Sequence, residues 1–268
     1  MDNTKDRLLR IAIEAAKRGG DVLMKYWENG ERLDVDEKGK NDYVTQVDRE
    51  AEKEIVSFIH SSVPDHDVVA EEFSRKKSGS RYVWLIDPLD GTTNYIHRFP
   101  VFCVSVSLLI DGEISVAAVF DPIRNDIFQA VKDKGAHLNQ KKLTVSHPGS
   151  FGRAVLATGF PFREQHRLEN YLKTFEHFVR TTSGIRRAGS AAIDLCYTAA
   201  GIFDGFWEMG LSSWDIAAGA LLVREAGGIV TDFHEGNRFL ETGDVVAASP
   251  FIHAELMKVI REAYPDSD

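Results

Sequence analysis

The sequence predicts a first lobe of the α+β class over residues 1–150 and a second lobe of the α/β class over residues 151–268. Two observations support this division. In the first lobe, two helical patterns are followed by a series of strand patterns, which is typical of an α+β arrangement. After about residue 150, helical and strand patterns alternate, as they do in α/β proteins.

Two amphipathic helices are expected near the start of the chain. Thr4 is a good N-cap, and the helix that follows should end near Gly30; its apolar residues are Leu8, Ile11, Ala12, Ala15, Leu23 and Tyr26. The second helix should run from about Val47 and end before Pro64, because proline disfavours helical geometry in the residue that precedes it. Its apolar face comprises Ala51, Ile55, Phe58 and Ile59.

The hydrophobic period then changes to that of strands. Apolar segments are separated by turn residues such as Asp111-Gly112, and we expect strands over residues 82–86, 101–110, 114–120 and 126–131. Short consecutive strands of this kind predict an antiparallel sheet.

The second lobe should contain four helices and two strands. We expect helices over residues 163–181, 190–200 and 214–226 and from His253 onward, with strands over residues 203–208 and 229–233. The sequence contains no repeat, low-complexity tract or Pro/Ser-rich linker, so the two lobes should form one compact unit.

Composition and charge exclude several classes of partner. With 43% hydrophobic residues, the 268-residue chain can build a sizeable core. The net charge is −9 and the Lys and Arg residues are scattered, so no positive field attracts nucleic acid or an anionic membrane. The sequence therefore disfavours a nucleic acid partner and a membrane partner.

The two cysteines and the first residues indicate a soluble cytoplasmic protein. Cys103 and Cys196 both lie in apolar runs and far apart, which favours buried, inert thiols over a disulfide or a metal site. The charged first residues lack the apolar region of a signal peptide, and no apolar stretch is long enough to span a membrane.

The segment WLIDPLDGTTN, residues 84–94, carries the main chemical signal. Asp87 and Asp90 offer oxygen ligands at the end of a strand, and the backbone carbonyl of Leu89 offers another. Amides of Gly91, Thr92 and Thr93 at a helix start would favour a bound phosphate. Carboxylates beside a phosphate site repel their ligand unless a divalent metal lies between them. Asp-Pro and Asp-Gly are also common turn dipeptides, and Thr is a common N-cap, so the turn interpretation stays open for this segment alone.

Two further acidic segments lie at the edges of apolar segments. They are AEEF at residues 70–73, which contains Glu71, and SWDIAAG at residues 213–219, which contains Asp215. Other catalytic signatures are missing from the sequence: it has no GxSxG or HExxH motif, and GIRRAGS at residues 184–190 lacks the lysine of a phosphate-binding Walker loop. A covalent Ser or Cys nucleophile therefore has no support.

Together these segments resemble the inositol monophosphatase family, most closely its bacterial inositol-1-monophosphatases. The resemblance covers nearly the whole chain and rests on residues 38–48, 70–73, 84–94, 157–162, 186–195 and 214–233. It implies a layered αβαβα sandwich of the inositol monophosphatase and sugar phosphatase type, which usually forms a homodimer.

The resemblance also implies a role for each candidate residue. The Mg²⁺ ligands would be Glu71, Asp87, the Leu89 carbonyl, Asp90 and Asp215, with Asp87 bridging two ions and a third, weaker ion near Glu71. Asp48 and Thr92 would position the water, so that Asp48, Glu71 and Thr92 form the catalytic group. Substrate contacts would come from Asp90, Gly91, Thr92, Gly189, Ser190, Ala191, Glu208 and Asp215. A mobile lysine corresponds to Lys38 or Lys40, and lithium at millimolar concentration is expected to inhibit.

The implied reaction is hydrolysis of a small phosphorylated polyol or sugar by a water that Mg²⁺ activates. Inositol monophosphate is the favoured substrate, because the acidic Glu208 suits a neutral polyol. Fructose 1,6-bisphosphate, histidinol phosphate and 3′-phosphoadenosine phosphate stay open, since Arg186 and Arg187 could serve a second phosphate or equally a dimer interface. A second role in binding transcription machinery also stays open, because some bacterial relatives have one.

Overall fold

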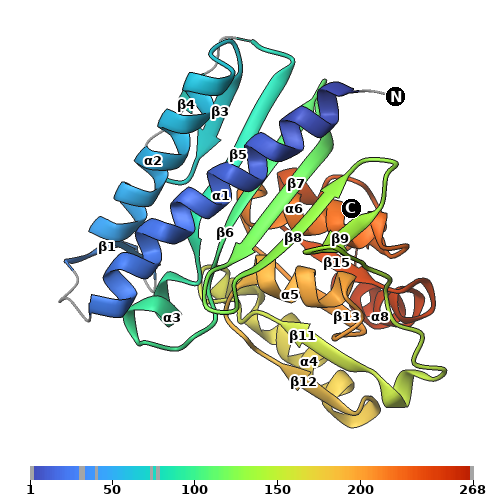
Figure 1. Cartoon of the computed structure of the whole chain (residues 1–268). Helices are drawn as coiled ribbons and strands as arrows, with labels where there is room; N and C mark the ends of the chain where they lie inside the picture. Colours follow the sequence, from blue (N-terminus) through green and yellow to red (C-terminus); the bar gives the residue numbers. More distant parts are fainter. Residues whose placement is uncertain (1–2, 30–33, 40–41, 73–74, 77–78, 266–268) are drawn as a thin grey trace.

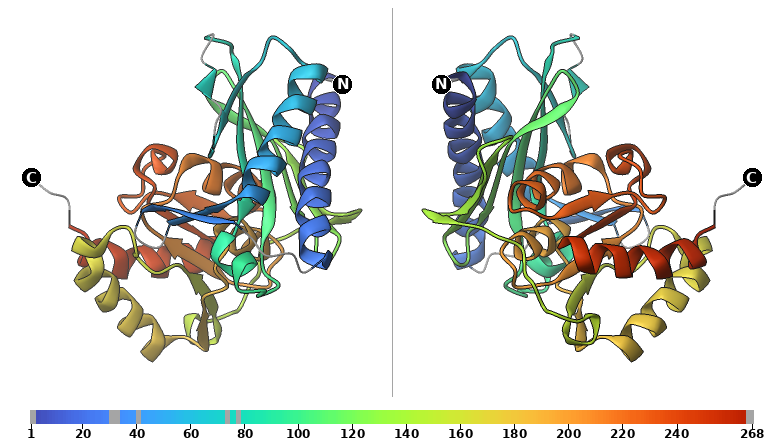
Figure 2. Two further views of the ribbon diagram at one scale, coloured as in Figure 1. Left: turned by 90° about the vertical axis from the view of Figure 1, so that its left-hand side faces the viewer. Right: turned by 90° about the vertical axis from the view of Figure 1, so that its right-hand side faces the viewer.

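The computed structural model has five layers, in which helices and sheets alternate (Figures 1 and 2). It describes residues 3–29, 34–39, 42–72, 75–76 and 79–265. Helices α1 and α2 pack on one face of an eight-stranded sheet, and α5 and α6 lie between that sheet and a five-stranded one. Helices α4 and α8 cover the outer face of the smaller sheet. The expected αβαβα sandwich is therefore confirmed.

The first layer contains the two expected helices. Helix α1 (Asn3–Asn29) begins one residue before Thr4, and α2 (Gln46–Ser62) ends before Pro64 as predicted. The N-cap of α2 is Thr45, whose side chain accepts hydrogen bonds from the first-turn amides. A two-stranded ribbon, β1 (Val35–Gly39) and β2 (Asp42–Thr45), joins the helices.

The large sheet contains the four predicted strands and four that were not predicted. Its order is β10-β9-β8-β7-β6-β5-β3-β4. The bounds are β3 (Asp67–Ala70), β4 (Arg75–Lys76), β5 (Tyr82–Asp90), β6 (Cys103–Ile110), β7 (Glu113–Asp121), β8 (Asp126–Val131), β9 (Ala136–Leu138) and β10 (Lys141–Lys142).

The four predicted strands pair antiparallel as expected, but β3, which was not predicted, runs parallel to β5. The short β4 pairs with the outer side of β3, and the chain then returns to the inner side of β3 as β5. Ala70 lies opposite Ile86 in this register. The parallel pairing consequently brings the carboxyl ends of both strands to one edge of the sheet, with Glu71 and Asp87 next to each other in register.

The small sheet has the order β12-β11-β13-β15-β14, in which β11 is parallel to both of its neighbours. Its bounds are β11 (Val155–Thr158), β12 (Gly184–Arg186), β13 (Gly205–Glu208), β14 (Ile229–Thr231) and β15 (Val245–Ala248). Strands β11, β12 and β15 were not predicted. The β15 segment VVAA is buried on both faces, so it lacks the alternation that marks a half-exposed strand.

The helices of the second half match the predictions apart from their starts. Predicted helix 163–181 begins later, as a 3₁₀ turn η2 (Gln165–Arg167) followed by α4 (Leu168–Thr181). The last helix, α8 (Pro250–Ala263), begins earlier than His253, with Pro250 in its first turn, where the missing amide has no cost. The two other predicted helices are α5 (Ala191–Ala199) and α6 (Ser213–Glu225). The short η1 (Phe151–Arg153) and α7 (Phe239–Thr242) were not predicted, and α3 (Thr92–Ile96) lies in the first half, at the helix start expected after Asp90.

Helices α5 and α6 form the middle layer and are apolar on nearly all sides, as expected for helices between two sheets. Their core joins residues of both halves of the chain, for example Val119 of β7 with Leu195 of α5 and Leu222 of α6. The predicted domain boundary near residue 150 therefore stays a prediction. Cys103 and Cys196 are free and buried in this core, as expected. None of the described helices is long and apolar enough to cross a membrane.

Candidate active site

A single cavity of about 560 Å³ collects the predicted site residues from both halves of the chain. The predicted residues that line it are Glu71, Asp87, Leu89, Asp90, Gly91, Thr92, Gly189, Ser190, Ala191, Glu208 and Asp215. Asp48 lies behind the lining, in contact with Thr92. Lys38 lies in β1, and Lys40 lies outside the described residues.

The end of β5 forms the floor of the cavity. The pairing of β5 with β6 is irregular between Asp87 and Asp90, so that Pro88 and Leu89 bulge out of the ladder while the two aspartates stay in register with β6. Oδ1 of Asp87 accepts a 2.9 Å hydrogen bond from the amide of Leu89. The Asp87 side chain is thereby fixed by its own turn, and it is only 2% exposed.

Gly91 forms the N-cap of α3 with φ = +98°. A side chain there would be strained and would lie 2.9 Å from the carbonyl oxygen of Val101. The glycine therefore lets the chain turn directly from the floor into a helix start. Amides in a first helical turn have no partner within the helix, so those of residues 91–93 suit an anion, as the sequence suggested.

Asp90 joins the floor to the middle layer. Its Oδ2 accepts 2.7 Å hydrogen bonds from the Ser190 hydroxyl and from the amide of Ala192. Ser190 is also the N-cap of α5, where its hydroxyl oxygen accepts from the amide of Ile193. One carboxylate of the first half is thus held by the start of a helix from the second half.

Asp215 and Asp48 are each fixed by a capping box. Oδ2 of Asp215 accepts a 2.8 Å bond from the amide of Ser212 at the start of α6. Oδ2 of Asp48 accepts from the amide of Thr45 at 2.9 Å and from its hydroxyl at 2.5 Å at the start of α2. Its Oδ1 lies 3.1 Å from the hydroxyl of Thr92, which donates toward it.

The crowding of carboxylates raises their pKa values. Burial, and then the charges of Glu71, Asp90 and Asp215, raise the pKa of Asp87 well above its usual range. Burial and the charges of Asp90 and Glu71 raise the pKa of Asp215 to about 8. Burial raises the pKa of Asp90 to about 6, against the hydrogen bonds from Ser190 and Ala192. This end of the cavity therefore favours a cation.

The donor set fits a hard divalent cation such as Mg²⁺. Within the part of the chain that the structure describes, no three His, Cys, Asp or Glu side chains converge closely enough to enclose an ion by themselves. Mg²⁺ does not require such a cage, because it keeps several waters and is usually held by one or two carboxylates together with substrate phosphate. Carboxylates and a backbone carbonyl are the oxygen ligands it prefers.

One wall of the cavity is formed by β13, α5 and the segment after β11. Glu208, at the end of β13, lies against Gly159, where an added Cβ would be 1.7 Å from its Oε1. Burial raises the pKa of Glu208 to about 8, and the charge of Arg187 opposes this. The Arg187 guanidinium lies 5.5 Å and 5.7 Å from the ring centres of Phe160 and Phe162.

Asp194 lines this wall from α5 and was not among the predicted site residues. A carboxylate in an otherwise apolar helix was the signal in the sequence that could have revealed it.

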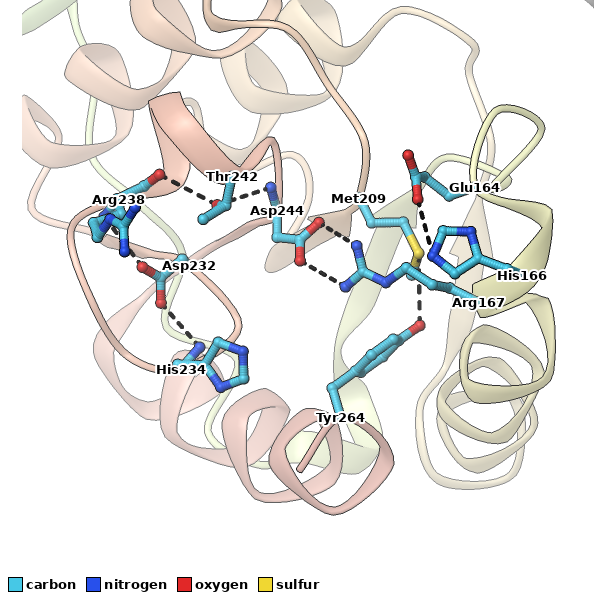
Figure 3. A network of polar contacts seen from close by, with 10 residues as sticks. All are labelled: Glu164, His166, Arg167, Met209, Asp232, His234, Arg238, Thr242, Asp244 and Tyr264. Atoms are coloured by element: carbon cyan, nitrogen blue, oxygen red, sulfur yellow. Dashed lines mark hydrogen bonds and ion pairs between the residues drawn. The ribbon is translucent and has the colours of Figure 1, made fainter. Parts of the chain in front are cut away.

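Behind this wall, a network of polar contacts ties the η2 segment to the residues just before β15 (Figure 3). Arg167 makes two hydrogen bonds to Asp244, of 2.7 Å and 2.6 Å. The next residue back, Gly243, has φ = +75°, and its carbonyl accepts from the amide of Leu211, which lines the cavity. The network therefore supports the wall from behind.

The comparison with family models decides the identity. The inositol monophosphatase family matches residues 4–264. The chain belongs to this family. The confirmed membership also gives the fold, because solved structures of the same family have the same layers.

Several relatives in the family are similar over their whole length. "Nus factor SuhB" of Pseudomonas aeruginosa is 45% identical over 265 residues, which cover 97% of this chain and 98% of the relative. The crystal structure of the extragenic suppressor protein suhB from Bartonella henselae has a TM-score of 0.92 at 36% identity and covers 96% of this chain and 99% of its own. The inositol monophosphatase from Anabaena has a TM-score of 0.86 at 37% identity, covering 97% of both chains.

Proposed function

We propose that the chain is a Mg²⁺-dependent phosphomonoesterase that hydrolyses inositol monophosphate to myo-inositol and phosphate. The observation that carries the proposal is the convergence of carboxylates from β5, from the residue after β3 and from the start of α6 on one end of a single cavity. The first-turn amides of α3 lie at the same end and suit the phosphate.

Glu71, Asp87, the Leu89 carbonyl, Asp90 and Asp215 would hold the cation. When bound, Mg²⁺ supplies positive charge to the phosphate oxygens and lowers the pKa of a coordinated water. The chain itself supplies positioning, which matters because phosphate-monoester hydrolysis is among the slowest uncatalysed reactions.

Thr92 and Asp48 would orient the attacking water. The Thr92 hydroxyl lies within hydrogen-bond distance of both Asp48, at 3.1 Å, and the Leu89 carbonyl, at 3.0 Å. It has one proton to donate, so its oxygen can accept a hydrogen bond from a water while it donates to Asp48. Asp48 is kept in place by the capping box of α2, and burial raises its pKa to about 6 against the bonds from Thr45.

Gly189, Ser190, Ala191 and Glu208 would hold the polyol. Glu208 lines the same cavity, where it can accept hydrogen bonds from hydroxyl groups. Arg187 lies on the same wall, and a substrate with a second phosphate, such as fructose 1,6-bisphosphate, is the alternative within this class.

The test is a phosphatase panel with Mg²⁺ over inositol monophosphate, fructose 1,6-bisphosphate, glycerol 2-phosphate and p-nitrophenyl phosphate. We expect the highest kcat/KM on inositol monophosphate, loss of turnover with EDTA, and inhibition by millimolar lithium. Equal turnover with EDTA and with Mg²⁺ would reject the metal-dependent mechanism.

A second proposed role is in transcription, and it is suggested by the name "Nus factor" of relatives that are 42–45% identical. These names favour a partner from the transcription machinery, whereas the negative charge of the chain alone disfavoured nucleic acid. A pull-down of RNA polymerase and Nus proteins with the wild-type chain and with Asp87→Asn tests it. Equal capture by both would separate binding from catalysis, and no capture by either would reject the role.

The resemblance also supports two proposals about state and location. The chain is proposed to form a homodimer, which sedimentation velocity can test directly, and to act in the cytoplasm, which cell fractionation can test.

A further inference from the structure

The wall formed by β13, α5 and the segment after β11 contains a second carboxyl group besides Glu208. Asp194, in α5, is only 1% exposed yet lines the cavity. Its Oδ1 is fully buried and accepts no hydrogen bond from the described residues. Buried polar atoms almost always have a partner, so this one requires an explanation.

The architecture of α5 does not explain Asp194. The helix is already capped by Ser190, and the backbone of Asp194 is satisfied by the Ser190 carbonyl, at 3.0 Å from its amide, and by the Thr198 hydroxyl, at 2.8 Å from its carbonyl. The neighbours of Asp194 in α5 are apolar and buried. An apolar residue would therefore fit the packing of α5 better, since burying a carboxyl without a partner costs free energy.

The charges around Asp194 favour its neutral form. Burial raises the pKa of Asp194 well above its usual range, the negative charges of Glu208 and Asp90 raise it further, and Arg187 opposes them. A neutral carboxyl can donate one hydrogen bond and accept others, as a hydroxyl group can. Two such carboxyls on one wall match adjacent hydroxyls of a polyol ring.

We propose that Asp194 is a specificity-determining residue that hydrogen-bonds a substrate hydroxyl beside the one held by Glu208. The substrate class is a cyclic polyol monophosphate with adjacent free hydroxyls. The inference rests on the proposed function, because the wall selects among substrates only if the cavity holds a phosphorylated polyol.

The main variant is Asp194→Ser. Serine within a helix can bond the carbonyl four residues earlier, so the shorter side chain has its own partner and no longer reaches the cavity. The ratio of kcat/KM for inositol monophosphate to that for p-nitrophenyl phosphate, which has no hydroxyls, should fall about threefold to tenfold, the effect of one hydrogen bond. Asp194→Asn keeps an amide that can donate and accept, and it should recover most of that ratio.

Asp232→Asn is the matched control, because Asp232 is a buried carboxylate of the second half whose partners are the backbone amides of its own loop. It should leave the ratio unchanged. An unchanged ratio in Asp194→Ser, or equal losses on both substrates, would make Asp194 a structural residue whose partner is a buried water, and would overturn the inference.

A second measurement keeps the test independent of turnover and of variant folding. In wild-type protein with ¹³C-labelled aspartate carboxyls, the Asp194 resonance should shift when myo-inositol is added, and the Asp232 resonance should not. Absence of a shift at saturation would also overturn the inference. If the wild type hydrolyses none of the phosphate esters, the proposed function fails, whereas the shift still reports whether Asp194 contacts a polyol.

Discussion

The Ser190 hydroxyl donates a 2.7 Å hydrogen bond to the Asp90 carboxylate across a sequence separation of 100 residues. Asp90 ends β5 in the large sheet, and Ser190 caps α5 in the middle layer. The bond therefore fixes the floor of the cavity relative to the wall that carries Ala191 and Asp194. The same serine serves the cap of a helix and the orientation of a proposed metal ligand.

We predict that Ser190→Ala lowers both stability and activity. The buried Asp90 loses one hydrogen bond and α5 loses its cap, so the free energy of unfolding should fall by about 1–3 kcal/mol. Urea unfolding measures this, and kcat with Mg²⁺ should fall as well. Ser249→Ala is the control, because Ser249 is also a buried N-cap but its hydroxyl has no partner in the described structure. Equal losses in the two variants would mean that the hydrogen bonds of Ser190 to Asp90 and to the start of α5 add no stability.

The sequence predicted the elements whose periods are long or regular. Helices α1 and α2 show a clear apolar face. Strands β5 to β8 are apolar segments of 6 to 9 residues, longer than the strands that were not predicted. The carboxylates of the DPLDGT and WDIAAG segments were chosen as site residues because acidic groups at the edges of apolar segments need a reason to be there. The structure places all of those in the lining of one cavity.

What could not be predicted depends on long-range pairing. The parallel register of β3 with β5, which places Glu71 beside Asp87, is set by the return of the chain after β4 and leaves no local signal. Strands β11 and β15 are short and buried on both faces, so they show no alternation. Asp194 was missed because its importance comes from its place in the cavity wall and its orphaned oxygen, neither of which a linear pattern contains.

We predict that Asp87→Asn abolishes turnover while the metal-free protein stays as stable as the wild type or becomes more stable. Asp87 is buried among Glu71, Asp90 and Asp215, so a neutral amide of the same shape removes repulsion. Turnover with Mg²⁺ and thermal melting in EDTA are the measurements. Asp121→Asn offers a contrast, since Asp121 is equally buried but paired with Arg124 at 2.8 Å, and its loss should lower the melting temperature. Near wild-type turnover in Asp87→Asn would remove Asp87 from the metal site.

Thr92 should need its hydroxyl rather than its shape. We predict that Thr92→Val lowers kcat by about a hundredfold, because it removes the group that contacts Asp48 and the proposed water. Thr92→Ser keeps the hydroxyl and should stay near the wild-type rate. Comparable kcat values for the valine and serine variants would place Thr92 in packing alone.

The pair of Arg167 and Asp244 should contribute a measurable coupling energy (Figure 3). Both side chains are mostly buried, at 22% and 11% exposure, and the guanidinium lies 5.0 Å from the ring centre of Tyr264. In a double-mutant cycle with Arg167→Met and Asp244→Asn, urea unfolding should give a coupling of about 1–3 kcal/mol. The exposed pair of Arg180 and Glu176 is the control and should give about 0.5 kcal/mol or less. Similar values for the two pairs would show that burial adds nothing here.

Glu208 should make the stability of the protein depend on pH in a definite direction. Its pKa rises from an ordinary value of 4.5 to about 8 on folding, mainly because it is buried. Between these values the folded state binds the proton more than the unfolded state does, so this group lowers the free energy of unfolding as the pH rises. The stabilising contribution is complete below about pH 4.5 and is lost by about pH 8.

Glu208→Gln removes this titration and keeps the shape of the side chain. We predict that the variant gains stability relative to the wild type as the pH is raised from 5 to 8, and that the difference levels off above pH 8. Urea unfolding of both proteins in EDTA at several pH values measures it. Glu164→Gln is the control, because Glu164 lies next to the same wall at Gly210 but its side chain is about one-third exposed. A difference between wild type and Glu208→Gln that does not change with pH would mean that folding does not raise the pKa of Glu208.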